Sequence, residues 1–544
     1  MLLADRPAED PALLASYADG NQSRRPRCTR NVAIGFGVVS VAAAAATAVV
    51  VSSFVLNHAD NSGAAACSPV QQTLVQSIPK GDFEVGPVAG SIPTHEAFIR
   101  LADAATKSLD FTAMYVDLLG SDDRKVYNAS EMLRFGAERG VEVFHALVRA
   151  AERHVSIRLL LGTLNCPRHC PLQSAEVQQL LAYPSVEARV WDPRRWYDGG
   201  IMHLKLWHVD RTAAYIGSAN PDWKSLAQVK EIGLLLNSSS TAKASATADL
   251  GRVFDVFWQW SQLSTPNVSV KSFSDAFQAE LTLPPWDVNI APESDRSTRS
   301  APFSITEGSP LAALTSVAAQ KPLCGTTATA TPPATVFVSA APGGSSTAGR
   351  TSDESALVHT IHSARTNLSL SVMDFLPASS FGGGHGGAPV HWPTLTNAVL
   401  AVAFSKPVHV RVLVSRWNHT SALMGPAMRR LADGLAACKQ VPNHKVYQPC
   451  AGTLEVRQYE VPGWQNTTGD HAVWPPFSRV NHAKYIVSDN RVNIGTSNWE
   501  WGYFYQTAGA SWNTNATEVV AAAQRVFDAD WESSYALPLS REAP

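Results

Sequence analysis

The sequence predicts an α/β protein made of two tandem α/β sandwich domains, preceded by one transmembrane helix. Three observations predict this class. A short signature of histidine, lysine and asparagine occurs twice, and each copy lies within a longer stretch of alternating strand and helix patterns. An uncharged apolar run precedes both stretches. The 544 residues also exceed one ordinary domain, which holds ~100–200 residues.

The apolar run is long enough to anchor the chain in a membrane. Residues 32–56 carry no charge, and ~20 apolar residues span a bilayer. Arginines at 24, 25, 27 and 30 precede the run, which places the N-terminus in the cytosol. We therefore expect a cytosolic tail at 1–31, a type II signal anchor at 32–56 and a stalk at 57–81. A cleaved signal peptide is the alternative, but its apolar core is usually only ~7–15 residues long.

Cysteines and glycosylation triplets beyond the anchor predict a secretory-pathway lumen. The disulfide candidates are Cys67, Cys166, Cys170, Cys324, Cys438 and Cys450. Cys438 and Cys450 flank one loop and form the best candidate pair, whereas Cys166 and Cys170 have a metal knuckle as their alternative reading. The N-glycosylation candidates are Asn128, Asn237, Asn267, Asn367, Asn418, Asn466 and Asn515. A tail segment with Leu13 and Leu14 resembles an acidic dileucine signal, which favours endosomes and lysosomes.

The two halves repeat one pattern. The β-branched run at 155–161 is echoed at 408–414, and helix-like runs at 97–107 and 357–365 precede these strands. Aromatic helical stretches at 252–258 and 525–531 follow the two signatures. Residues 291–334 are rich in Pro, Ser, Thr, Gly and Ala, as a linker is. We therefore expect domain 1 at 82–290 and domain 2 at 335–544, with a strand at 335–339.

The two signatures match in order and type. The first comprises His203, Lys205, Asp210, Gly217, Ser218 and Asn220; the second comprises His482, Lys484, Asp489, Gly495, Thr496 and Asn498. Alternate residues of a strand share a face, so each histidine and its lysine point the same way. The glycines are expected to let the backbone approach an anion closely. The aspartates are predicted to be structural turn residues.

This constellation suits cleavage of a phosphodiester without a metal or other cofactor. Lysines and asparagines can hold the non-bridging oxygens, one neutral imidazole can attack phosphorus, and the other can protonate the leaving oxygen. A nucleophilic histidine needs a carboxylate that fixes its tautomer. Glu231 is the candidate partner of His203, whereas the matching region at 506–509 has no carboxylate. We therefore expect His203 to be the nucleophile and His482 the general acid and base.

Aromatic residues follow both asparagines and are candidates for stacking on nucleic-acid bases. They are Trp223, Trp499, Trp501, Tyr503 and Phe504. Packing in the core is the alternative for each of them. The formal net charge of −2 provides no overall basic field, so a polyanion would have to be bound locally.

At these signatures the chain resembles the phospholipase D superfamily, marked by His-x-Lys-x₄-Asp followed by Gly-x-x-Asn. The stretches at 203–231, 480–484, 494–499 and 507–509 are similar to its single-span lysosomal phospholipase D3/D4 branch. The resemblance implies two α/β/α sandwich domains that face each other across one shared active site. It also implies a homodimer and an acid 5′-3′ exonuclease on single-stranded DNA and RNA. The sequence departs from the branch at Tyr505 and Gln506, where a glutamate is expected.

Three functions remain open at this stage. The first is a lysosomal exonuclease. Such a protein would reach the lysosome through the endoplasmic reticulum and Golgi, and it would stay anchored or be released in soluble form. The second is a phospholipase D or transphosphatidylase acting on phospholipids or lysophospholipids, which would require an apolar trough. The third is an inactive luminal glycoprotein that only binds, against which two full signatures argue.

Overall fold

The computed structural model describes residues 70–164, 170–197, 199–238, 245–262, 334–342, 350–379, 390–439, 450–469 and 472–539. All of these belong to one compact unit that begins at Ala66. The predicted tail, the anchor at 32–56 and nearly all of the linker at 291–334 lie outside the described residues. Across these nine ranges, no helix is both long and apolar enough to cross a bilayer.

The first half forms an eight-stranded sheet in the order β2-β1-β8-β7-β6-β3-β4-β5. Its strands are β1 (Val70–Ser77), β2 (Ile92–Pro93), β3 (Ser108–Ala113), β4 (Ser156–Leu161), β5 (Val186–Val190), β6 (Leu206–Val209), β7 (Ala213–Gly217) and β8 (Glu231–Ser238). Its helices are α2 (Thr94–Ala104), α3 (Ala129–Phe135), α4 (Glu138–Glu152), α5 (Ala175–Leu181), α6 (Arg194–Tyr197), α7 (Trp223–Ala227) and α8 (Ala246–Trp260). These helices form where apolar residues recur at helical spacing. In helix α2, for example, Ala97, Phe98, Leu101 and Ala102 share one buried face.

The second half forms another eight-stranded sheet, in the order β16-β12-β11-β10-β13-β14-β15-β9. Its strands are β9 (Val336–Ala341), β10 (Asn367–Val372), β11 (His409–Ser415), β12 (Thr453–Tyr459), β13 (Lys484–Ser488), β14 (Val492–Gly495), β15 (Gly509–Thr514) and β16 (Ala536–Pro538). Its helices are α11 (Asp353–Ser363), α12 (Thr394–Ser405), α13 (Met424–Lys439), α14 (Trp501–Tyr505) and α15 (Thr517–Trp531).

The strand orders confirm the internal duplication. The run β1-β8-β7-β6-β3-β4-β5 in one sheet corresponds strand for strand to β9-β15-β14-β13-β10-β11-β12 in the other. In both runs the last three strands are parallel, and the signature strands are antiparallel to their neighbours. The two predicted α/β domains are therefore two copies of one topology.

The first sheet begins earlier than the sequence predicted. Strand β1 lies at 70–77, inside the expected stalk at 57–81, so this part of the stalk prediction is wrong. Strand β1 pairs antiparallel with β8 along its whole length, as β9 pairs with β15 in the second half. Its polar residues Gln71, Gln72 and Thr73 hide the strand pattern, although four of its eight residues are buried on the sheet at its C-terminal end.

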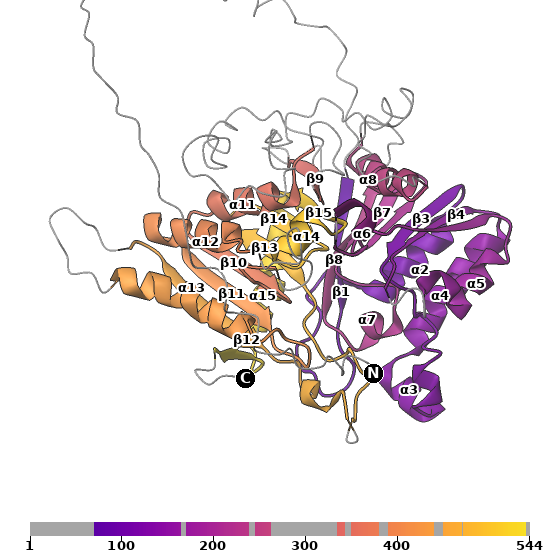
Figure 1. Ribbon diagram of the computed structural model, residues 1–544, viewed down its shortest axis with the longest axis horizontal. Helices are drawn as coiled ribbons and strands as arrows, with labels where there is room; N and C mark the ends of the chain where they lie inside the picture. Colours follow the sequence, from indigo (N-terminus) through magenta and orange to yellow (C-terminus); the bar gives the residue numbers. More distant parts are fainter. Residues whose placement is uncertain are drawn as a thin grey trace, which may run out of the picture. The chain divides into compact units, whose positions relative to one another are not determined.

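Residues of both halves form one central hydrophobic cluster, where β7 and β8 lie against β14 and β15 (Figure 1). Buried ion pairs join the halves as well. Lys230 Nζ lies 2.8 Å from Asp530 Oδ2, and both guanidinium nitrogens NH1 and NH2 of Arg350 lie 2.7 Å from the carboxylate of Asp249. Because removing one member would leave an unpaired buried charge, these pairs fix how the halves pack.

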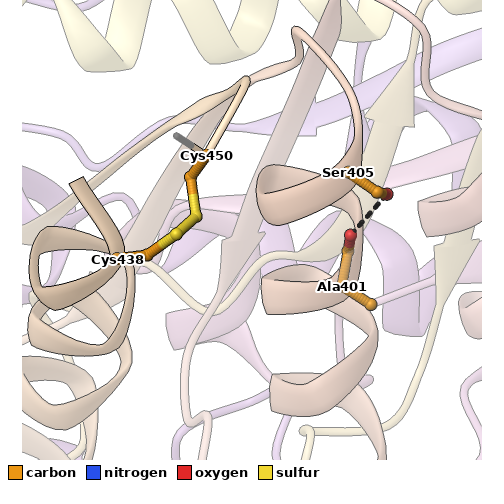
Figure 2. The surroundings of a disulfide bond; sticks show 4 residues. All are labelled: Ala401, Ser405, Cys438 and Cys450. Carbon is orange, nitrogen blue, oxygen red and sulfur yellow. Dashed lines mark hydrogen bonds between the residues drawn. A yellow bond between two sulfur atoms is a disulfide. The ribbon is translucent and has the colours of Figure 1, made fainter. Parts of the chain in front are cut away.

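One of the predicted disulfides is confirmed. Cys438 near the end of α13 is bonded to Cys450, with 6.0 Å between their Cα atoms (Figure 2). Beside this bond, the Ser405 hydroxyl donates to the Ala401 carbonyl within α12. Cys170 is also disulfide-bonded. Cys67, Cys166 and Cys324 lie outside the described residues.

Of the six glycosylation candidates that the structure describes, five occupy exposed positions. Asn128, Asn237, Asn367, Asn418 and Asn466 are exposed. Asn515 is half-buried and accepts a hydrogen bond from the Thr335 backbone, and Asn267 lies outside the described residues.

Candidate active site

Each signature histidine is held in place by the opposite half of the molecule. The His203 amide donates to the Ala508 carbonyl at 3.1 Å, and Ala508 returns a bond to Ile201. The His482 amide donates to the Lys230 carbonyl at 2.8 Å, while Lys230 bonds to Val480. This exchange places the start of each signature beside the start of β8 or β15 of the other half. Two distant segments thereby meet.

The two imidazoles face one another at a distance that suits a single phosphate. Their ring centroids lie 6.3 Å apart at an interplanar angle of 69°. A nucleophile and a proton donor on opposite sides of one phosphorus would each stand ~3–3.5 Å from the atom that they engage. His203 is buried and His482 is half-buried.

Each signature lysine contacts the backbone of the histidine in its own signature, and the two contacts are equivalent. Lys205 Nζ donates to the His203 carbonyl at 2.9 Å, and Lys484 Nζ donates to the His482 carbonyl at 2.7 Å. Burial lowers the pKa of Lys484 to about 8, against the charges of Glu231 and Asp374. Burial and the charge of Lys484 lower the pKa of Lys205 well below its ordinary value. A bound phosphate anion would raise both pKa values and so favour the charged form of each lysine.

The signature asparagines have free acceptor oxygens but different neighbours. Both Oδ1 atoms are buried without a hydrogen-bond partner. Asn498 Nδ2 donates to Asp374 Oδ2 at 2.8 Å and to the Tyr503 hydroxyl at 3.3 Å. Burial raises the pKa of Asp374 to about 6, although Lys484 opposes this. The sequence analysis did not identify Asp374; its signal is its position just beyond the carboxyl end of β10, where ligands of α/β sheets gather.

Glu231 is in the site but contacts the other histidine. Its carboxylate oxygens lie 3.1 and 2.9 Å from His482 Nδ1, and not on His203 as predicted. His203 Nδ1 is buried beside the Thr496 backbone with no carboxylate in hydrogen-bond contact. The prediction failed because Glu231 opens β8, and that end of β8 meets the second signature across the interface between the halves.

The position equivalent to Glu231 in the second half is Gly509. Gly217 pairs with Gly233 in the first sheet and Gly495 pairs with Ser511 in the second, so Glu231 and Gly509 occupy the same register. A side chain at Gly509 would collide with the Ser497 hydroxyl. The two halves therefore differ at the carboxylate that orients a histidine, which gives the imidazoles unequal surroundings.

These surroundings separate the pKa values of the two imidazoles. Burial, followed by the charges of Lys205 and Lys484, lowers the pKa of His203 well below its ordinary value. Burial also lowers the pKa of His482, but the Glu231 carboxylate raises it in opposition. His482 is thus the imidazole whose protonated form a carboxylate stabilises, and His203 is the one that the lysines keep neutral.

The signature glycines serve strand packing. A Cβ on Gly217 would lie 2.5 Å from the Cα of Gly233 on β8, and one on Gly495 would collide with Ser511 on β15. The Ser218 hydroxyl accepts from the Ile232 amide at 3.0 Å, and the Thr496 hydroxyl accepts from the Ala510 amide at 3.1 Å. The close approach that the structure shows is to a neighbouring strand, and the expected approach to an anion stays a prediction.

The signature aspartates lie at the far end of the signature strands. Asp210 accepts four hydrogen bonds of 2.7–2.8 Å from Thr106, Lys107 and Ser108 at the start of β3. Asp489 accepts the equivalent bonds from residues 365–367 at the start of β10. Seven residues of extended chain, ~23 Å, separate Asp210 from His203. Neither aspartate can reach a phosphate at the histidines.

Replacing Asp210 with alanine should reduce stability without changing the chemistry. We expect the free energy of unfolding, measured by urea titration at neutral pH, to fall by about 2 kcal/mol because charge-assisted bonds are lost. Partial burial raises the pKa of Asp210, but its hydrogen bonds lower it overall. This contribution to stability is therefore present above the ordinary pKa of 3.8 and disappears as pH falls through the lowered value.

A matched control is Asp122→Ala, which removes an exposed carboxylate paired with Lys125. We expect it to change stability by less than ~0.5 kcal/mol. Loss of kcat in folded Asp210→Ala protein would show that the aspartate acts in the reaction.

The predicted stacking residues are all buried, so none offers a free face to a base. Trp223 donates to Asp123, Trp499 packs edge-on against Phe375, Trp501 stacks on Tyr505, and Phe504 packs against Trp392. Tyr503 alone contacts the site, with its ring 5.0 Å from that of His203. Core packing, the alternative for each residue, is therefore what the structure shows for Trp223, Trp499, Trp501 and Phe504. Tyr503 supports His203 and Asn498.

Two α/β repeats that together enclose one pair of histidines and one pair of lysines are the architecture of a two-domain phosphodiesterase. Residues 98–258 match the family model described as "Cardiolipin synthase, PLD-like domain", and residues 327–461 match "PLD3/4, PLD-like domain". The chain is 30% identical to phospholipase D Z of Dictyostelium discoideum, over 83% of this chain and 87% of that protein. It is 30% identical to the 5′-3′ exonuclease PLD3 of Rattus norvegicus, over 87% and 82% respectively.

The chain belongs to the phospholipase D superfamily, in its PLD3-like branch. Among solved structures, the phosphatidylserine synthase of Haemophilus influenzae Rd KW20 superposes with a TM-score of 0.46 and 11% identity, covering 80% of this chain and 84% of that one.

Proposed function

We propose that this protein is a lysosomal 5′-3′ exonuclease that hydrolyses single-stranded DNA or RNA through a phosphohistidine. The observation that carries the proposal is the pair of buried imidazoles, 6.3 Å apart, beside two lysines. The 5′-3′ exonuclease PLD3 proteins of several vertebrates, at 28–30% identity, support the substrate class. Because the histidines lie below the surface, a single strand can bring a phosphate to them more readily than a duplex can.

The chemistry proceeds in two steps. The neutral His203 imidazole attacks phosphorus, an N–P bond forms, and the bond from phosphorus to the leaving strand oxygen breaks as His482 donates its proton to that oxygen. A water molecule then gives a proton to His482 and attacks phosphorus, and the N–P bond breaks. Lys205, Lys484, Asn220 and Asn498 hold the non-bridging oxygens.

The proposed roles follow from the unequal pKa values. The nucleophile must be neutral, and burial beside two lysines lowers the pKa of His203. The acid must be protonated, and Glu231 stabilises the imidazolium of His482. His203 therefore remains the proposed nucleophile, on grounds different from the carboxylate contact first expected.

The proposal extends to the organisation and location of the chain. We place a signal anchor at 32–56, luminal domains at 70–290 and 335–544, and a linker at 291–334 between them. The exposed asparagines of the glycosylation triplets would carry N-glycans in that lumen.

The direct test is digestion of a single-stranded oligonucleotide with a free 5′-hydroxyl by the purified full chain at pH ~5 in the presence of a chelator. We expect stepwise shortening from the 5′ end, little action on a duplex, and no shortening with His203→Ala. Shortening from the 3′ end, or none at all, would refute the exonuclease assignment.

A lipid phosphodiesterase is the second candidate, because phospholipase D Y and phospholipase D Z of Dictyostelium discoideum match with similar coverage. Incubating phospholipid vesicles with a primary alcohol would reveal head-group exchange. Exchange that depends on His203, together with intact oligonucleotide, would reverse the order of the two candidates.

A further inference from the structure

An exposed stack of aromatic rings lies near the two histidines, and the function described so far does not use it. The Phe477 side chain is 57% exposed. The ring of His419 lies parallel to it, with 4.7 Å between centroids and 9° between planes. Trp417 meets His419 edge-on at 4.8 Å and lies 6.4 Å from Phe477. We call Phe477, His419 and Trp417 the Phe477 stack.

The stack stands at the same end of the strands as His482. Trp417 comes two residues after the end of β11, and the Ser415 hydroxyl donates to the carbonyl of Asn481, the neighbour of His482. The Ser415 amide bonds to Met373, whose amide bonds to Ala483. Strand β11 is separated from β13 by β10 alone, so the backbones of β11 and β13 run ~10 Å apart.

The loop that carries Phe477 is held in an unfavourable backbone conformation. Phe477 has φ 58° and Arg479 has φ 57°, in the left-handed region that non-glycine residues rarely adopt. Arg479 is buried and anchors the loop, with Nε donating to the Pro462 carbonyl at 2.6 Å and NH1 donating to the Lys80 carbonyl at 2.7 Å. Its guanidinium lies 3.9 Å from the Trp474 ring centroid. Such strain persists where the surroundings enforce it, and it gathers at binding sites.

We propose that the exposed face of Phe477 stacks on the base of a nucleotide adjacent to the scissile phosphate; this inference rests on the nuclease function proposed above. His419 covers one face of the ring, so the exposed area lies on the opposite face and the edges. A base placed there would extend an existing parallel stack. Stacking of this kind accepts every base, as a nuclease without sequence preference requires.

The surroundings favour a base over a membrane as the occupant. Asn418, which precedes His419, is exposed and donates to the exposed Thr468 at 2.7 Å. Arg416 adds a positive charge beside Glu460. The exposed ring of Phe477 lies parallel to the exposed ring of His419, which suits one flat aromatic partner, whereas insertion into lipid requires a broader apolar face.

The test combines Phe477→Ala with a series of oligonucleotides that each lack one base near the 5′ end. We expect Phe477→Ala to lower kcat/KM on the complete oligonucleotide by about 5- to 150-fold, as loss of one base–aromatic stack does. On the one oligonucleotide that lacks the stacked base, the variant and the native protein should differ by less than about twofold. Phe477→Trp should retain native activity.

Phe404→Ala is the matched control. Phe404 is 42% exposed at the end of α12. It lies near the start of β11, at the end of the strands opposite to the Phe477 stack. We expect native activity from it.

Three results would overturn the proposal, and each differs from failure of the nuclease function. An equal loss for Phe477→Ala on every base-deleted oligonucleotide, or activity equal to Phe404→Ala, would reject stacking while native protein still digests the strand. Loss of binding to anionic phospholipid vesicles with unchanged digestion would assign the ring to a membrane. If native protein digests no oligonucleotide, the nuclease function itself fails.

Discussion

His203→Ala should abolish both turnover and the covalent phosphoryl adduct, because it removes the proposed nucleophile. His482→Ala should lower kcat on an oligonucleotide by about 10²–10⁴-fold, the usual contribution of a general acid. Alkaline quenching followed by intact-mass measurement would detect the adduct, since the N–P bond is labile in acid.

A substrate with a good leaving group separates the two histidines more sharply. A p-nitrophenyl phosphodiester needs little protonation to leave, so His482→Ala should still form the adduct on His203. The adduct should then accumulate, because its hydrolysis lacks the base that activates water. An adduct that survives His203→Ala and disappears with His482→Ala would exchange the two roles. Thermal unfolding of both variants would show that each is folded.

Glu231→Gln should lower kcat/KM by about 10–100-fold, the usual effect of losing a partner that orients a reactive histidine. It should also shift the pH profile. The reaction requires protonated His482, whose pKa lies below the ordinary 6.5, so activity should decline as pH rises through that pKa. Because the Glu231 carboxylate raises the pKa of His482, its loss lowers that pKa and moves the alkaline limb to lower pH.

The control for this shift is Glu176→Gln, the same change at another buried carboxylate. Burial raises the pKa of Glu176 to about 7, so at acidic pH glutamine replaces a side chain that is already neutral. We expect its pH profile of kcat/KM to be native. A Glu231→Gln profile with an unmoved alkaline limb would show that the carboxylate does not set the protonation of His482.

Local patterns were enough to predict the fold and most of the site. The paired signatures identified His203 and His482, and apolar, β-branched runs of strand length predicted strands such as β4 and β11. These local patterns could not predict which residues of one half contact residues of the other. Glu231 was correctly chosen as a carboxylate partner but assigned to the wrong imidazole, because the contact with His482 depends on how two distant segments pack.

Burial was the other quantity that sequence could not supply. Trp223 and Trp499 follow the signature asparagines and looked available to bases, yet both pack in the core. Phe477 stands five residues before His482 and is exposed, in a loop where Phe477 and Arg479 both have left-handed φ angles. Residue spacing predicts neither how deeply an aromatic ring is buried nor which backbone φ angle its residue adopts.

The glycine at 509 has a further consequence for how a polymer is processed. In the proposed mechanism, a carboxylate lies behind one imidazole and none lies behind the other, so attack and departure take fixed sides of the phosphorus. A strand threaded in the reverse sense would present its departing oxygen to His203, the proposed neutral nucleophile. Two repeats in one polypeptide can differ at this position, as Glu231 and Gly509 do, whereas a symmetric pair of identical subunits cannot.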